Sequence, residues 1–454
     1  MRLIANRIGV IGGGPAGLAV ARVLASEPGT PFAVTVLERS NDVGGIWNYT
    51  PDPVCHYNIP QDSAASALAK EYDECSCTTG GFPTPIYDDL HTNLPKDVMQ
   101  FPGVPFPKDA PDFPDRKQVQ QYVHRYYNDP DNRLQGLVQL NSEVESVKYE
   151  NSEWVCTVRR LSNDNRTDTL KFDALAICTG RVSHPYIPCV PGLEELAQEN
   201  PGIVTHAKEY RRASDYIDMT VLVVGGASSG TDISRQLSFT ARQVHLSVRS
   251  NENNDALEPT LGAGVNQSNR LRRHPQIQSI TNDSVVFVDG SSIELPDRII
   301  YATGYLSVYP FFQGNDQLEV LTDGRRINNL YKYLLYTQNP TLAIFGIPTK
   351  VVPFPLFEYQ ATFLAKVLRG IVKLPSHEEM QSQWDDLARQ TSSHKQLYEF
   401  GMRQVEYQNE LISIINNAYK NASDRERLRL GHVSEEWAQR RKHTFELRMK
   451  ILGY

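Results

Sequence analysis

A glycine-rich turn between an apolar strand and an apolar helix constrains the fold of this chain more than any other feature. It lies in GVIGGGPAGLAVA, where Gly12, Gly14 and Gly17 have the spacing G-x-G-x-x-G. In such turns the first glycine makes the tight turn and the second lets the backbone approach a pyrophosphate. The third lets the helix pack on the strand. Phosphates are therefore expected at the N-terminus of the helix.

The elements around this turn predict a strand–helix–strand unit. Residues 7–11 form the first strand, the helix begins with Pro15 and Ala16, and the second strand ends with Glu38 and Arg39. A carboxylate at the end of that strand accepts hydrogen bonds from a ribose diol and repels a 2′-phosphate. The first site is predicted to bind FAD or NAD. The alternative is an ordinary turn with a solvated glutamate.

The same pattern occurs again in VVGGASSGTDI, residues 223–233. A strand over residues 220–225 precedes the turn. Gly225, Ala227 and Gly230 keep the spacing, with alanine in the middle position. The methyl group loosens the fit to a pyrophosphate, but hydroxyl groups beside it can donate to phosphate oxygens. We therefore predict a second nucleotide site in this part of the chain.

Polar residues of the second turn indicate which dinucleotide it binds. Ser228 and Ser229 supply the hydroxyl groups, and the helix is expected to start near Ser229. Arg249 ends the next predicted strand, over residues 243–249, where the first copy has an acid. Arginine suits a 2′-phosphate by its charge and planar donors. The second site is predicted to bind NADPH, with a solvated strand-end arginine as the alternative.

A further repeat predicts how the chain is divided. DALAICTG (173–180) and DRIIYATG (297–304) share an aspartate, an apolar run and a Thr-Gly pair. Both are predicted to be buried strands that end in tight turns against the cofactors. The residues of these turns are Thr179, Gly180, Thr303 and Gly304.

The order of these units predicts an α/β fold with two Rossmann-like dinucleotide-binding domains, the NADPH domain inserted into the FAD domain. The FAD-binding domain is expected over residues 1–181 plus 305–454, and the NADPH-binding domain over 182–304. Three prolines in residues 181–192 indicate a linker at the first boundary.

Other segments are less regular. Residues 50–90 are rich in Pro, Asp, Ser and Gly and predict a long surface excursion with one short helix from Ser63 to Tyr72. Residues 137–148 and 153–160 are expected to form antiparallel strands. The role of the 50–84 part of the excursion stays open.

The C-terminal part predicts a strand over residues 340–348 and then an amphipathic helix from about Phe357 that ends at Gly370. The apolar residues placed on one face of this helix are Phe357, Ala361, Leu364, Ala365 and Leu368. The sequence from about Ser376 is polar and helical in pattern.

Composition excludes several classes of protein. The net charge of −7 argues against general nucleic-acid binding, which needs a basic surface. The six cysteines contain no C-x-x-C pair, so a disulfide reductase and a zinc site are rejected and no metal is expected. Cys75 and Cys77 are interpreted as reduced surface thiols. We expect a cytoplasmic protein with no signal peptide and no integral membrane segment.

Together these features resemble the flavin-containing monooxygenases, which are class B flavin-dependent monooxygenases. The resemblance covers residue 7 to about residue 370, and the compact form is most similar to soluble fungal members. The motifs that carry it are GGGPAG (12–17), ERSNDVGGIWNY (38–49), LHTNLPKDVMQFPGVPFP (90–107), PGIVTHAKEYR (201–211), GGASSGTD (225–232) and YATGY (301–305).

One motif departs from the family. The pattern F-x-G-x-x-x-H-x-x-x-Y/F corresponds here to Asn200, Gly202, His206 and Tyr210, so its first phenylalanine is replaced. His206 and Tyr210 are interpreted as structural residues that link the two domains, with a catalytic role for His206 as the alternative. Related Baeyer–Villiger enzymes of the common type have tryptophan at the position of Tyr210. The tyrosine favours oxidation of heteroatoms over ketones.

The resemblance implies roles for further residues. Gly45, Ile46 and Trp47 would lie along the FAD, and Thr92 and Asn93 would lie at the flavin edge. Asn93 is the candidate catalytic residue, because an amide can donate and accept hydrogen bonds without adding charge. The alternative for Asn93 is a turn-capping role.

Three more residues are implied to bind the cofactors. Tyr186 would stack on NADPH, with burial in the core as the alternative. Gln360 would meet the flavin ring, with a solvated face as the alternative. Val144 is also assigned to cofactor binding.

The resemblance implies a monooxygenase that uses FAD, NADPH and O2, forms a C4a-hydroperoxyflavin, and oxygenates soft nitrogen or sulfur atoms of small molecules such as N,N-dialkylanilines and thioethers. Two alternatives stay open: a Baeyer–Villiger or specialised biosynthetic oxygenase on the same fold, and an NADPH-binding flavoprotein that does not oxygenate. The sequence does not name the substrate, and a homodimer is not settled.

Overall fold

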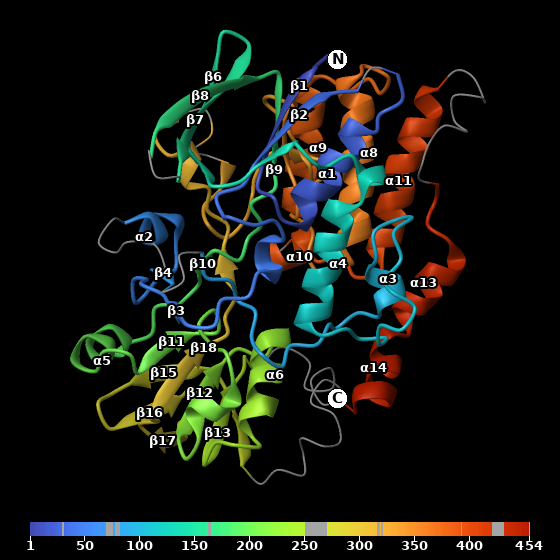
Figure 1. Cartoon of the computed structure of the whole chain (residues 1–454). Coiled ribbons are helices and arrows are strands. Elements are labelled where there is room, and N and C mark those ends of the chain that lie inside the picture. Colours follow the sequence, from blue (N-terminus) through green and yellow to red (C-terminus); the bar gives the residue numbers. More distant parts are fainter. Residues whose placement is uncertain are drawn as a thin grey trace. The chain divides into compact units, whose positions relative to one another are not determined.

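The computed structural model describes residues 1–29, 31–69, 76–77, 82–161, 165–249, 270–315, 318, 321–391, 393–419 and 431–453. The chain forms two compact units (Figure 1). Unit 1 comprises Met1–Asn48, His91–Gly180 and Tyr309–Thr444, and unit 2 comprises Tyr49–Leu90, Arg181–Val308 and Phe445–Tyr454.

Unit 1 contains a seven-stranded sheet in the order β20-β21-β22-β9-β1-β2-β5, in which β22, β9, β1, β2 and β5 are parallel. Its strands are β1 (Arg7–Ile11), β2 (Ala33–Leu37), β5 (Val138–Gln139), β9 (Ala174–Ile177), β20 (Leu330–Tyr331), β21 (Leu335–Tyr336) and β22 (Leu342–Ile344). A separate antiparallel sheet has β6 (Ser142–Glu150), β7 (Glu153–Arg160) and β8 (Thr167–Phe172).

The helices of unit 1 come from its three chain segments. They are α1 (Pro15–Ala25), η1 (Gly45–Trp47), α3 (Lys96–Met99), α4 (Arg116–Asn128), η2 (Pro130–Asn132), η4 (Pro310–Phe312), α8 (Pro353–Leu368), α9 (His377–Gln390), α10 (His394–Tyr398), α11 (Arg403–Ala418) and α13 (Glu435–Lys442). A last helix, α14 (Thr444–Leu452), begins at the final residue of this unit.

Unit 2 contains an all-parallel sheet in the order β11-β18-β12-β13-β14. Its strands are β11 (Val204–His206), β12 (Thr220–Val224), β13 (Gln243–Ser247), β14 (Leu271–His274) and β18 (Arg298–Tyr301). The other elements are β3 (Pro53–Val54), β4 (Ser76–Cys77), α2 (Ala64–Leu68), β10 (His184–Pro185), α5 (Leu193–Glu199), η3 (Ala213–Tyr216), α6 (Ser228–Leu237), β15 (Ile277–Ile280), β16 (Ser284–Phe287), β17 (Ser292–Glu294) and β19 (Tyr305–Leu306).

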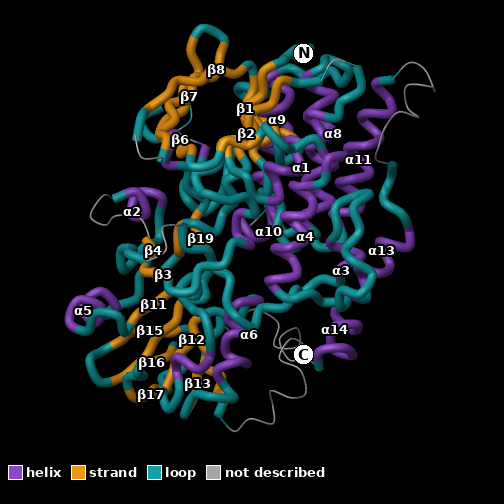
Figure 2. The backbone as a smooth tube through the Cα atoms, viewed as in Figure 1, coloured by secondary structure: helices purple, strands orange, loops and turns teal. Residues whose placement is uncertain are grey.

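The predicted α/β class is confirmed, because each unit has a parallel sheet with helices packed on it (Figure 2). In unit 1 the apolar side chains of α1 and α8 join those of β1 and β2 in one core. In unit 2 the apolar face of α6 packs with β12 and β13 in a core of its own. The two nucleotide-binding patterns thus belong to separate cores.

The structure corrects three expectations about elements. The segment 49–90, expected within the first domain, belongs to unit 2, because its backbone hydrogen bonds at Gln61 reach Ile187. The strand expected over 137–148 is divided, since β5 pairs with β2 while β6 pairs with β7. The short helix expected to reach Tyr72 ends at Leu68, and Tyr72 lies outside the described residues.

The helix expected to start near Phe357 begins earlier, at Pro353, and it is not amphipathic. Nearly all its side chains are buried, because α1 and α11 pack against it. Its expected end is confirmed: Gly370 has φ +64°, a left-handed conformation that glycine adopts without strain.

Two buried ion pairs join α8 to α1 and the residues after it. Arg22 Nη1 donates to Glu358 Oε1 at 2.6 Å, and Tyr126 donates to the same oxygen at 2.8 Å. Lys366 pairs with Glu27, and both are buried. Burial raises the pKa of Glu358 above its ordinary value, because a carboxylate loses hydration there. These contacts fix the helix that follows the first glycine-rich turn.

Replacing Glu358 with Gln should lower the free energy of unfolding by about 3–5 kcal/mol, because Arg22 is left as a buried charge without its partner. Urea titration of the purified protein measures the change. The control is Glu153→Gln at the exposed Arg7 pair, which should cost less than about 1 kcal/mol. Equal losses in the two variants would contradict the assignment of Glu358.

Candidate functional site

The glycines of the first glycine-rich turn make close backbone contacts that leave no room for a side chain. Gly12 has φ +107°, and a Cβ added to it would lie 2.6 Å from the carbonyl oxygen of Cys178, at the end of β9. A Cβ on Gly17 would lie 1.9 Å from the carbonyl oxygen of Gly12. The strands β1 and β9 end level with each other, since Ile11 pairs with Ile177. The turn therefore needs glycine at both positions.

The second turn repeats these contacts in unit 2. Gly225 has φ +118°, and a Cβ on it would lie 2.5 Å from the carbonyl oxygen of Ala302, after β18. A Cβ on Gly230 would lie 1.8 Å from the carbonyl oxygen of Gly225. Each unit thus brings a strand–turn–helix element against the end of a neighbouring strand.

The two Thr-Gly turns also have the same form. Gly180 and Gly304 both have left-handed backbone, with φ of +74° and +89°. Thr179 and Gly180 are exposed, while Thr303 and Gly304 are half-buried. Both turns follow a buried strand, as the repeat predicted, and the residue after that strand lies against the first glycine of the nearby glycine-rich turn.

The N-termini of α1 and α6 have the donors that a pyrophosphate needs. Among the described residues, neither helix receives a side-chain cap, whereas α4 and α9 have full capping boxes. Uncapped first-turn N–H groups are available to an anion, and the helix dipole favours negative charge there. Ala227, Ser228 and Ser229 are exposed at the start of α6. This donor set fits the pyrophosphate of a dinucleotide at the start of each helix.

Glu38 is buried rather than solvated, which corrects the alternative for this residue. Its Oε2 accepts from Gly13 N at 2.6 Å, and its Oε1 accepts from Ser40 N at 2.8 Å. These two bonds fix the carboxylate beside the turn and leave other lone pairs for the hydroxyls of a ribose. Arg39, next in the chain, is half-buried.

Arg249 follows the end of β13 by two residues and is exposed. The strand is two residues shorter than the sequence predicts. The contact of Arg249 with a 2′-phosphate stays a prediction.

The segment Gly44–Trp47 packs against the first turn. Gly44 N donates to the carbonyl of Gly13 at 3.1 Å, and a Cβ on Gly45 would lie 2.9 Å from the Cα of Gly14. Ile46 is exposed, while the side chain of Trp47 packs partly into the core of unit 1. The structure therefore brings this motif and the fingerprint together, and the close approach at Gly14 is one reason for glycine there.

Thr92 and Asn93 differ in their surroundings. Thr92 is buried, with its hydroxyl donating to the carbonyl of Leu94 at 2.9 Å and its N–H to that of Pro114 at 3.0 Å. Asn93 is exposed, and within the described part of the chain its side chain has no hydrogen bond. The bonds of Thr92 fix the backbone that presents the amide of Asn93, and Asn93 does not cap a turn.

Other predicted site residues lie at different depths. Val144 lies on β6 and is buried in an apolar core of unit 1. Tyr186 is half-buried, and its N–H donates to the carbonyl of Gly304 at 2.9 Å. Gln360 has no exposed surface and donates to Tyr407 at 3.1 Å, so the solvated face expected as an alternative is wrong. A contact of Gln360 with a flavin ring would need this side chain to be uncovered and stays a prediction.

His206 and Tyr210 are buried and hydrogen-bonded within unit 2. His206 Nε2 donates to the carbonyl of Gly304 at 3.0 Å, while its Nδ1 accepts from Lys208 N at 3.1 Å. Tyr210 donates to Gln236 at 2.9 Å. Burial lowers the pKa of His206 to about 3, so the ring is neutral. These bonds give both residues structural roles inside one unit rather than a link between two.

Sequence reasoning missed two buried polar residues of unit 2, Arg211 and Gln61. Arg211 follows Tyr210 within a recognised motif, but nothing in its neighbours indicates burial. Gln61 lies in the excursion, where polar composition predicts exposure. Both make long-range hydrogen bonds that no local pattern encodes.

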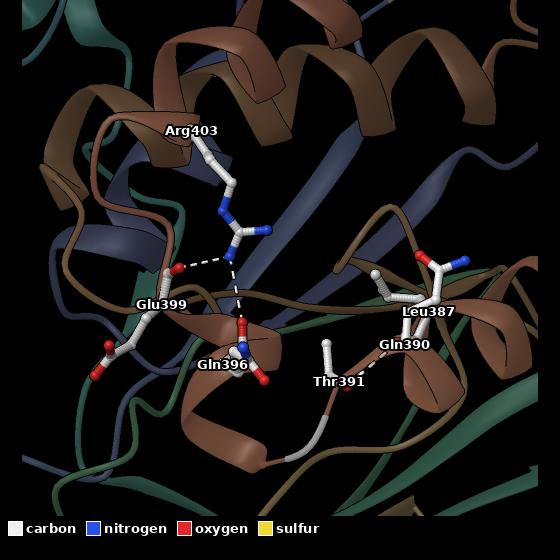
Figure 3. A pocket seen from close by; sticks show the side chains of 6 residues that line it. All are labelled: Leu387, Gln390, Thr391, Gln396, Glu399 and Arg403. Atoms are coloured by element: carbon white, nitrogen blue, oxygen red, sulfur yellow. Dashed lines mark hydrogen bonds between the residues drawn. The ribbon is translucent and has the colours of Figure 1, made fainter. Parts of the chain in front are cut away.

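A cavity of about 430 Å³ lies within unit 1 near the start of α11 (Figure 3). Its lining residues are Leu387, Gln390, Thr391, Gln396, Glu399 and Arg403. Arg403 donates to the carbonyls of Gln396 at 3.3 Å and Glu399 at 2.6 Å. None of the predicted site residues lines this cavity, and its polar lining does not suit an apolar substrate.

The described residues were expected to hold no metal site and no membrane-spanning helix. No group of three or more His, Cys, Asp or Glu side chains there could hold a metal ion. No helix in the same residues is both long and apolar enough to cross a membrane. Cys55, Cys156, Cys178 and Cys189 form no disulfide bond within the described residues. Cys75 lies outside those residues, as does the side chain of Cys77.

Comparison with known proteins covers most of the chain. The sequence model of the family "Flavin-binding monooxygenase-like" matches residues 76–257 and 267–423. That of the "NAD(P)-binding Rossmann-like domain" matches residues 10–74.

Individual relatives match over most of their length. The flavin-containing monooxygenase FMO GS-OX-like 9 of Arabidopsis thaliana is 31% identical over 395 residues, which cover 85% of this chain and 80% of the relative. The thiol-specific monooxygenase of Saccharomyces cerevisiae is 31% identical over 379 residues, which cover 80% and 77%. The structure of S-allyl-L-cysteine S-oxygenase from Allium sativum has 27% identity and a TM-score of 0.80, and covers 100% of this chain and 95% of that chain.

The structural role of His206 predicts a specific pH dependence. His206 has a pKa of 6.5 in the unfolded chain and of about 3 in the folded chain. Between these values only the unfolded chain binds the proton, so the free energy of unfolding falls as the pH drops. From pH 6.5 to pH 5 the loss from this residue is about 2 kcal/mol. The variant His206→Gln keeps a donor for the carbonyl of Gly304 but does not titrate. Its free energy of unfolding should therefore fall by about 2 kcal/mol less than that of the wild type between pH 6.5 and pH 5.

Urea titrations of both proteins at the two pH values measure this difference. Parallel losses would contradict a buried neutral His206.

Proposed function

The chain belongs to the Flavin-binding monooxygenase-like family, and from this we propose that it oxygenates soft nitrogen or sulfur atoms of small molecules with O2 and NADPH. The protein is a flavin-dependent monooxygenase with FAD and NADPH as its cofactors. The observation that carries the proposal is the glycine-rich turn that occurs in both units. Glu38 is fixed beside the first turn, and Arg249 follows the strand after the second.

For a thioether the reaction balances as substrate, O2, NADPH and one proton giving sulfoxide, NADP⁺ and water. FAD, when bound, supplies the chemistry that no protein side chain can, which is transfer of electrons from NADPH to O2. The protein contributes binding, orientation and exclusion of water.

The residues of unit 1 would hold FAD at defined places. The first-turn N–H groups of α1 would bind its phosphates, and Glu38 would accept hydrogen bonds from the adenosine ribose. Gly45 and Trp47 lie beside the turn and would follow the cofactor toward its reactive end. Asn93 would donate and accept hydrogen bonds at the flavin edge, as its exposed and unbonded amide in the described structure allows.

The residues of unit 2 would hold NADPH. The start of α6 presents N–H groups and the hydroxyls of Ser228 and Ser229 to the pyrophosphate. Arg249 would bind the 2′-phosphate by charge and paired donors. Tyr186, held by Gly304, would stack on the dinucleotide.

The names of two relatives favour sulfur as the oxidised atom. One is a thiol-specific monooxygenase, and another is an S-oxygenase of S-allyl-L-cysteine. Tyr210 at the position of a tryptophan in common Baeyer–Villiger enzymes also favours heteroatoms. A ketone oxygenase and a flavoprotein that only makes peroxide are the competing functions.

Product analysis tests this proposal. FAD-loaded protein with NADPH in air should convert methyl p-tolyl sulfide to its sulfoxide with about one product per NADPH, and should not convert cyclohexanone to its lactone. In Asn93→Ala the sulfoxide per NADPH should fall about tenfold or more, with hydrogen peroxide in its place and unchanged FAD content. The matched control, Asn128→Ala on the exposed end of α4, should behave as wild type.

Lactone without sulfoxide, or peroxide alone with both sulfides and amines, would contradict the proposed function. Unchanged sulfoxide yield in Asn93→Ala would contradict the role of Asn93.

A further inference from the structure

Arg211 is a buried arginine that joins both ends of the segment Thr50–Thr84. Only 3% of its surface is exposed. Its Nε donates to the carbonyl of Thr50, and its Nη2 donates to the carbonyl of Thr84 at 2.8 Å. One guanidinium therefore fixes the places where this segment leaves and rejoins the rest of unit 2.

The remaining donors of Arg211 bind its own turn. Nη1 donates to the carbonyls of Lys208 at 2.9 Å and Tyr210 at 2.8 Å, and the ring of Tyr49 lies 5.7 Å from the guanidinium carbon. All four of these acceptors are backbone carbonyls. Burial lowers the pKa of Arg211, because the charge loses hydration. Burying the guanidinium costs free energy, and its N–H groups are used to bind backbone carbonyls. We therefore assign Arg211 a role in holding the backbone in place.

Between its fixed ends the segment forms an isolated antiparallel bridge, Gln61 with Ile187, beside Tyr186. Gln61 N donates to the carbonyl of Ile187, and Ile187 N donates to the carbonyl of Gln61, both at 2.9 Å. The Gln61 side chain donates to the carbonyl of Pro185 at 2.7 Å. Gln61 is buried, so these bonds are shielded from water. The residues on both sides of Tyr186 are thus bonded to the segment.

On its other side Tyr186 is bonded to the Thr-Gly turn. Tyr186 N donates to the carbonyl of Gly304, and the hydroxyl of Thr303 donates to the carbonyl of Tyr186. The strand β10 before Tyr186 pairs with β19 after the turn. A second contact of the segment, the hydroxyl of Tyr57 on Glu209, lies near His206 in the same unit.

We propose that Arg211 is a positioning residue for NADPH: by joining the ends of the segment Thr50–Thr84 it holds Gln61 on the backbone of Pro185 and Ile187 and so sets the place of Tyr186. This rests on the proposed function only in that Tyr186 and the Gly304 turn contact NADPH. It gives the described part of this segment, whose role the sequence leaves open, a task in binding the cofactor.

Hydrogen–deuterium exchange on the protein without NADPH tests whether Arg211 holds the segment against the backbone around Tyr186. Arg211→Gln should raise exchange at the amides of Gln61, Tyr186 and Ile187 about tenfold or more, while the amides of β12 stay protected. The control is Arg242→Gln, an exposed arginine of the same unit that pairs with Asp297 and not with the segment, which should leave exchange at these amides unchanged. Unchanged exchange in Arg211→Gln would overturn the proposal whatever dinucleotide the protein uses.

Kinetics of the FAD-loaded protein test the consequence. In Arg211→Gln the KM for NADPH should rise about tenfold, with kcat at saturating NADPH within about twofold of wild type. A folded Arg211→Gln with unchanged KM, or with lost kcat at unchanged KM, would overturn the proposal. If this variant does not fold, Gln61→Met removes the side-chain bond to Pro185 and should raise KM severalfold in the same direction; unchanged KM there would equally overturn it.

The two readouts separate this proposal from the function on which it rests. Wild-type protein that does not use NADPH would defeat the proposed function, while the exchange experiment would still report on Arg211.

Discussion

Two backbone contacts that exclude a Cβ are the constraint on which the rest of the structure depends. In each unit a helix glycine lies against the carbonyl of the first glycine of the turn, and that first glycine lies against the carbonyl of the residue that follows the neighbouring strand of the sheet, β9 in unit 1 and β18 in unit 2. These contacts hold the helix, the turn and two strands at van der Waals distance. The N-terminus of the helix therefore lies at the carboxyl ends of the strands, where its first N–H groups can bind an anion. Everything proposed for the cofactors follows from this placement.

Patterns in the sequence predicted this part of the molecule well, for a physical reason. Glycine spacing, apolar strands and the repeat of the Thr-Gly turns are local, and the contacts they make are within or beside the same strand–turn–helix element. The bounds of β1 and the starts of α1 and α6 agree with the prediction to within about one residue. Gly45 lies against Gly14 of the first turn, and its expected place along the FAD stays a prediction.

What the sequence did not predict depends on distant partners. The helix α8 has an apolar face in its sequence, yet it also buries Glu358 and Lys366, because ion partners on and beside α1 satisfy them. The excursion has a surface composition, yet Gln61 and Arg211 are buried, since each is bonded to carbonyls far away in the chain. A polar residue enters a core only where its partner is supplied, and the partner is set by the fold rather than by neighbours in sequence.

The central claim is that one chain binds two different dinucleotides at two copies of the same strand–turn–helix element. A crystal structure of the protein with FAD and NADP⁺ tests it most directly. We predict the FAD pyrophosphate at the start of α1 with Glu38 on its adenosine ribose, and the NADP⁺ pyrophosphate at the start of α6 with its 2′-phosphate on Arg249. NADP⁺ in unit 1, or a 2′-phosphate that does not touch Arg249, would contradict the account.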